Sequence, residues 1–109
     1  MKIRMRLHEV DRQTYGGPEW SELHLDQLAE VDSGLLEEFE ETIGLTVVGE
    51  FPEQLQRRAL KAIRAALWLS RRLSGHKDDW TTFKPNLLKV DFELVDEDDP
   101  GKADPPSGS

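Results

Sequence analysis

The chain has 109 residues, with 14 Lys and Arg against 22 Asp and Glu, and a formal net charge of -8 at pH 7. That length fits one domain, and the negative charge argues against nucleic-acid binding, which draws on a basic surface. The chain contains no run of about 18 apolar residues, so we expect no membrane span. The absence of Cys excludes disulfides, Cys-ligated zinc, iron–sulfur clusters and thiol catalysis.

Acidic and basic residues are segregated along the chain. No Lys or Arg lies between Arg12 and Arg57, and the stretch Glu19–Glu53 holds 11 acids. The stretch Arg57–Arg72 then holds six bases and no acid, and Asp91–Asp99 holds six acids and no base. Such blocks attract one another within a chain or between copies of it.

The N-terminal residues alternate between apolar and basic side chains, which is typical of a half-buried strand. This strand is predicted over residues 2–10, with Ile3, Met5 and Leu7 on its buried side. Residues 15–18 predict a loop or hairpin turn. A second strand with Trp20 packed is predicted over residues 20–25.

The acidic block contains one predicted helix, over about residues 33–43. Asp32 or Ser33 can cap its first turn with a side-chain oxygen, and Gly44 can end it. Its apolar residues fall at helical spacing, and glutamates occupy the opposite face.

A longer central helix is predicted over about residues 53–74. Pro52 suits its first turn, where a missing N–H costs nothing, and Gly75 can end it. Leucines, isoleucine and alanines fill about half of its circumference, and bases fill most of the rest. Such a helix is expected at the centre of the fold, with other elements packed closely against it.

A C-terminal strand is predicted over residues 87–95, where apolar and charged residues alternate. If it pairs with the N-terminal strand, its acids can face Arg4 and Arg6. The expected fold is therefore α+β, with a small sheet packed on the two helices in one domain, residues 1–95. Residues 96–109 are acidic and rich in Pro, Gly and Ser, and are predicted to be a disordered tail.

The residue patterns give little support for catalysis. The three His lack metal-ligand spacing, and Gly16-Gly17 is followed by Pro18 instead of a phosphate-binding pattern. We therefore expect no enzyme activity, no metal and no cofactor.

One aromatic residue departs from the apolar pattern of the central helix. At 100° per residue, Trp68 projects into the basic arc and away from the apolar face. An indole among guanidinium groups can grip an apolar residue surrounded by acids. Trp80 and Phe83 either pin the following loop to the helix or extend the same surface. The candidate partner-binding residues, called the basic stripe below, are Arg57, Lys61, Arg64, Trp68, Arg71 and Arg72, together with Trp80 and Phe83.

Three occupants of the basic stripe are open at this point: the chain's own acidic helix or C-terminal strand, a second copy, or a foreign helix or peptide. A membrane surface is disfavoured by the flanking acidic blocks. We expect the indole of Trp68 to point away from the monomer's own interior, so that Trp68→Ala with Arg64→Glu impairs association more than folding.

Residues 59–99 and 36–52 resemble the small tail assembly chaperones of long-tailed phages that infect actinobacteria. The resemblance is carried by Trp68, the Arg71-Arg72 pair, Gly75, Trp80 with Phe83, and the acidic end of the strand. It implies a non-enzymatic protein that binds and shields the long tape-measure protein during tail assembly. It also implies self-association, a location in the host cytoplasm, and absence from the finished virion.

Two alternatives remain beside this expectation. One is another phage structural or adaptor protein, such as a head–tail connector or tail terminator, which would stay in the finished particle. The other is a small acidic regulatory protein that masks a basic partner.

Overall fold

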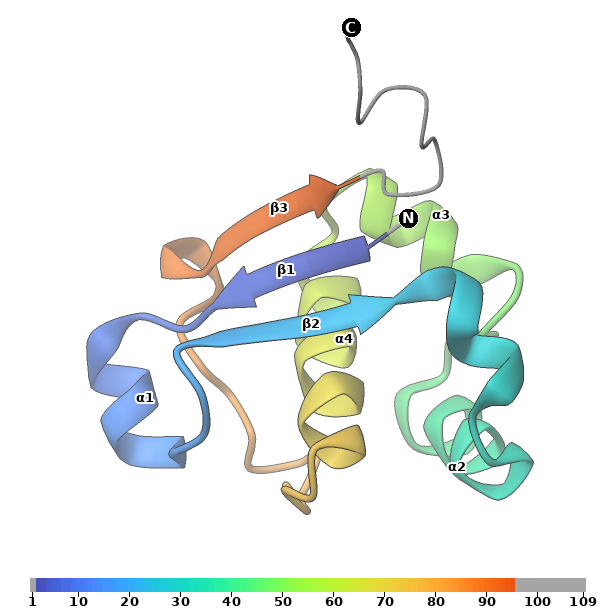
Figure 1. Ribbon diagram of the computed structural model, residues 1–109, viewed down its shortest axis with the longest axis horizontal. Coiled ribbons are helices and arrows are strands. Elements are labelled where there is room, and N and C mark those ends of the chain that lie inside the picture. Colours follow the sequence, from blue (N-terminus) through green and yellow to red (C-terminus); the bar gives the residue numbers. More distant parts are fainter. Residues whose placement is uncertain (1, 96–109) are drawn as a thin grey trace, which may run out of the picture.

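The sheet at the centre of the fold has three antiparallel strands in the order β2-β1-β3 (Figure 1). The computed structural model describes residues 2–95. Its strands come from both ends of this range, so that the last strand lies beside the first. Helices accompany the sheet, and the predicted α+β class is confirmed. The strands are β1 (Lys2–Arg6), β2 (Trp20–His24) and β3 (Asp91–Val95).

The two faces of the sheet follow the alternation of its strands. Ile3, Met5 and Leu23 point inward and are buried. On the outer face, Arg4 pairs with Glu93 at 3.1 Å and Arg6 Nε donates to Asp91 at 2.8 Å, which confirms the predicted cross-strand pairs. Trp20 is not packed inside, because its register places it opposite Arg6 on the outer face.

A short helix, α1 (Glu9–Tyr15), separates the first two strands and was not predicted. It buries none of its residues, and Val10 is 60% exposed, so it has no apolar face that the sequence pattern can reveal. Asp11 ties it to the C-terminal segment by accepting a hydrogen bond from the Asn86 backbone N–H at 2.8 Å. Residues 16–18 are thus the loop from α1 to β2 and not a hairpin turn.

The acidic helix is confirmed as α2 (Ser33–Ile43), reached through a 3₁₀ helix, η1 (Leu25–Glu30). Gly44 ends α2 with φ +85°, a backbone conformation that L side chains rarely adopt. The Asp32 side chain makes no capping hydrogen bond; its carbonyl instead accepts from the first turn of α2.

The predicted helix over 53–74 is wrong as one element, because the structure divides it into α3 (Glu50–Gln56) and α4 (Leu60–Leu73). Arg58 in the break has φ +59°, and no helix continues through that conformation. The break allows each helix to turn its own apolar side chains toward the core, including Phe51 and Leu55 of α3.

Helix α4 crosses behind the sheet (Figure 1). It is buried from Ala62 to Arg71 except at Arg64, which is half-buried. The alanines at 62, 65 and 66 are fully buried, in agreement with the predicted close approach of other elements. No helix within residues 2–95 has the length and apolar character needed to cross a membrane.

The C-terminal strand begins later than predicted. Residues Leu87–Lys89 form a 3₁₀ helix, η2, and Leu88 is 84% exposed instead of lying on the inner face of the sheet. The predicted tail, residues 96–109, lies outside the described residues.

Candidate partner-binding surface

The central residue of the basic stripe, Trp68, is buried, with only 1% of its surface exposed. Its ring packs against Phe39 of α2 and Trp80, and its Nε1 donates to the Asp78 carbonyl at 3.0 Å. The prediction that Trp68 points away from the monomer interior is therefore wrong. Helical projection assumed one apolar face, but α2 and the loop after α4 cover the other side of this helix.

Arg71 is also buried, and it acts as a cross-link inside the monomer. Its Nε donates to the Asp78 carboxylate at 2.6 Å, and its terminal nitrogens donate to the carbonyls of Tyr15 and Gly16 at 2.7 Å each. A Cβ at Gly17 would lie 2.7 Å from Arg71 Nη1 and would push the guanidinium away from its carbonyl partners, and Gly17 also has φ +100°, which favours glycine. These bonds satisfy the guanidinium internally and leave it unavailable to a partner.

Arg64 holds the loop that contains Trp80 and Phe83. It donates to the carbonyls of both residues and stacks on the Trp80 ring, 3.8 Å from the centroid. Partial burial lowers the pKa of the Arg64 guanidinium. Phe83 is 1% exposed and packs edge-to-face on Tyr15. The two aromatics therefore pin the loop to the fold, one of the two roles considered for them.

The remaining bases of the stripe are divided between the interior and the surface. Arg72 stacks on the Trp68 ring and pairs with Glu38 at 3.0 Å, which joins α4 to α2. Arg57 and Lys61 are exposed, and Arg57 lies 3.7 Å from Glu53. The stripe is thus not a continuous surface, and it mainly holds the monomer together.

An apolar groove lies on a different surface, where η1, α2 and the connector before α3 meet. It has a volume of about 350 Å³. Val48 in the connector lies at the edge of this groove and is 89% exposed. We call this the η1 groove; it is lined by Leu25, Asp26, Leu28, Ala29, Leu36, Val47, Val48 and Pro52.

Local hydrogen bonds fix the connector in this exposed position. The Val47 N–H donates to the Glu40 carboxylate at 2.8 Å. Thr46 and Glu50 bond each other reciprocally, since each backbone N–H donates to the other's side-chain oxygen, at 3.1 and 2.8 Å. Val47 is thereby buried and Val48 is directed outward.

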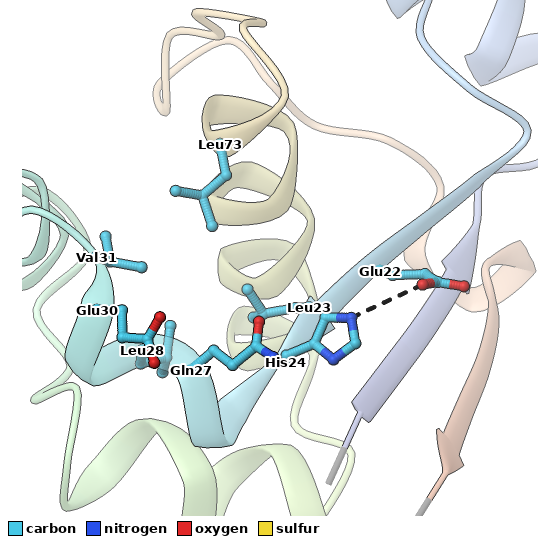
Figure 2. A pocket seen from close by; sticks show the side chains of 8 residues that line it. All are labelled: Glu22, Leu23, His24, Gln27, Leu28, Glu30, Val31 and Leu73. Carbon is cyan, nitrogen blue, oxygen red and sulfur yellow. Dashed lines mark ion pairs between the residues drawn. The ribbon is translucent and has the colours of Figure 1, made fainter. Parts of the chain in front are cut away.

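A second hollow, the η1 pocket, lies on the other flank of η1, toward the end of α4. Figure 2 shows its apolar side chains together with polar groups, and its volume is about 240 Å³. His24 Nε2 lies 3.9 Å from Glu22 Oε1. Leu28 lines both hollows, so η1 forms a ridge between them. The pocket is lined by Glu22, Leu23, His24, Gln27, Leu28, Glu30, Val31 and Leu73.

The surface around η1 carries excess negative charge because it is built mainly from the acidic block. Glu22, Glu38 and Glu53 are neutralised by bases from β1, α4 and the segment between α3 and α4. Within residues 2–95, Glu30 and Glu41 take part in none of the ion pairs that the structure shows. The pocket, with Glu22 and Glu30, and the groove, with Asp26, therefore combine apolar walls with acidic side chains.

Sequence reasoning found the acidic block but missed the groove inside it. The sequence pattern predicts neither a helix nor a strand for Val47 and Val48, and it predicts that Leu25 ends a strand. The available signal was an apolar pair in a segment between two acidic helices. Which valine is exposed depends on the hydrogen bonds that Glu40, Thr46 and Glu50 make.

No family model, no curated protein and no solved structure matches the chain. Among residues 2–95, no cluster of His, Asp and Glu side chains has the arrangement needed to hold a metal ion.

Proposed function

We propose that this protein is a non-enzymatic tail assembly chaperone that binds the tape-measure protein of a long-tailed phage and shields it in the host cytoplasm. The observation that carries the proposal is the η1 groove, with the highly exposed Val48 at its edge. The family resemblance supplies the class of partner, and the groove supplies a surface on which such a partner can bind.

The groove suits an amphipathic helix that lays its apolar face against exposed aliphatic side chains. A tape-measure protein is expected to present such apolar stripes along a great length. Each groove is small, with a volume of about 350 Å³, so one copy would bind weakly, and many copies along one chain would act through avidity. The surrounding acids would keep the coated chain dispersed by mutual repulsion.

We also propose self-association, through those bases of the basic stripe that are not used inside the monomer. The basic stripe is largely consumed within the monomer, so Arg57 and Lys61 are its exposed members. Contacts between these bases and the acidic surface of a second copy would weaken with salt, because exposed charges are screened.

Two exposed aliphatic residues allow a matched test of the proposed function. Val48 lies in the η1 groove, whereas Leu88 lies in η2, and the two are 89% and 84% exposed. Neither substitution by Asp should unfold the protein, because both side chains already face solvent. Co-expression with the tape-measure protein of the same phage, followed by co-purification, compares the two variants.

We expect Val48→Asp to lower tape-measure binding about tenfold or more, since it would place an unpaired carboxylate against the partner's apolar face, and Leu88→Asp to leave it within about twofold. Equal binding by the two variants would contradict the assignment of the groove. Mass spectrometry of purified virions separates the chaperone from a connector or terminator, because an assembly chaperone should be absent from the finished particle.

A further inference from the structure

We infer that the η1 pocket receives a lysine or arginine side chain from the same helical segment that fills the η1 groove. This inference rests on the proposed function and goes beyond it, because it specifies that the bound segment is basic as well as apolar. It also gives the acidic block a direct role in recognition.

The chemistry of the pocket matches a long cationic side chain. Leu23, Leu28 and Val31 provide aliphatic surface, and Leu73 adds more from the end of α4. The methylene stem of Lys or Arg packs on surface of this kind, while its charged head stays at the polar edge.

The polar edge of the pocket supplies acceptors for that charged head. Glu22 and Glu30 line the pocket with Gln27 and His24 (Figure 2). Glu22 is already within 3.4 Å of Arg4, so its charge is partly compensated. Glu30 is exposed and takes part in no ion pair that the structure shows within residues 2–95. Glu30 is therefore the acceptor best placed for a partner's ammonium or guanidinium group.

One bound segment can occupy the pocket and the groove together, because the two hollows are adjacent. Only η1 separates them, and Leu28 contributes to both. Ala29 on this ridge is exposed and small, which allows a partner backbone to approach. A helix lying across η1 can place apolar residues in the groove and a residue three or four positions away in the pocket.

A second copy of this chain is a weaker candidate for the occupant. Of the exposed bases of the basic stripe, Arg57 already lies 3.7 Å from Glu53 of its own chain, and Lys61 Nζ lies close to Gly44 at the end of the acidic helix. An anionic occupant is opposed by the excess of acids around η1. Charge complementarity thus favours a basic, apolar helix from a different protein.

The test uses the full chain of this protein and a set of overlapping 20-residue peptides that together cover the tape-measure protein. The tightest-binding peptide is made again with each Lys or Arg replaced by Met, and each version is titrated by fluorescence anisotropy against wild type and Glu30→Gln. Glu41→Gln is the matched control, because Glu41 is an exposed acid of α2 that lines neither hollow.

We expect one Lys or Arg replacement to weaken binding to wild type by about three- to tenfold, as for one hydrogen-bonded ion pair that stays partly exposed to solvent. Glu30→Gln should weaken binding of the unmodified peptide similarly and should remove the effect of that replacement. Glu41→Gln should change the affinity less than twofold.

Two other results would overturn the inference in distinguishable ways. Binding that depends on Val48 but is unchanged by Glu30→Gln and by every base replacement would reject the η1 pocket and leave the proposed function intact. Failure of every peptide and of the whole tape-measure protein to bind wild type would reject both.

Discussion

The guanidinium of Arg72 lies over the indole of Trp68 within the monomer, with 4.5 Å between the guanidinium carbon and the ring centroid. Arg72 continues outward to Glu38, so an aromatic contact and an ion pair join α4 to α2. Arg71, one residue earlier, points to the Asp78 carboxylate instead. Bases on this helix thus complete the core by covering its aromatic rings.

Replacing Trp68 tests this arrangement at the scale of one residue. We expect Trp68→Ala to lower the free energy of unfolding by about 3–5 kcal/mol, because it leaves a large cavity among Phe39 and Trp80. Trp20→Ala is the control, since Trp20 lies on the outer sheet face over Arg4 and Arg6 and should cost about 1 kcal/mol. Urea denaturation followed by circular dichroism measures both.

A cost for Trp68→Ala no larger than that for Trp20→Ala would contradict the burial of Trp68. The expectation from sequence alone was the reverse, namely that this position would affect association more than folding. The burial of the ring makes a change at this position a poor probe of partner binding.

At the scale of elements, the residue pattern of the sequence predicted the features that neighbouring residues in the chain determine. The alternation in β1 and β3 gave both strands and their charge pairs, and Gly44 marked the end of α2. Helix α1 was missed because it buries no side chain, so it carries no periodic signal. The break at Arg58 was missed because apolar spacing continues through it, although the backbone does not.

The end of α2 gives a test at this scale. Gly44 has φ +85°, so we expect Gly44→Ala to lower the free energy of unfolding by about 1–2 kcal/mol through backbone strain. Gly34→Ala is the control within the same helix: φ there is not left-handed, alanine is the better helix former, and the Asp32 carboxylate that lies 3.1 Å from the added Cβ is exposed and can move aside. Thermal unfolding of the two variants measures the difference; equal stability would contradict the left-handed conformation at Gly44.

At the scale of the whole molecule, the acidic and basic blocks of the sequence differ in how many of their charges are paired. The bases of β1 and α4 are largely paired inside the monomer or across the sheet. Within residues 2–95, the acids of α2 outnumber the bases that pair with them, and the apolar groove beside α2 leaves Val48 exposed. The sequence alone predicted that the charge blocks attract one another. Which of their charges are paired depends on tertiary contacts such as that of Arg72 with Glu38.

The central claim is that a helical partner binds at the ridge formed by η1. Hydrogen–deuterium exchange of the full chain, with and without the tape-measure protein, tests it most directly. We predict slower exchange for amides of Leu25–Glu30 and of residues 44–52 in the complex, and unchanged exchange for α1 and η2. Slower exchange over α1, η2 or the outer face of the sheet, with η1 unaffected, would contradict the claim.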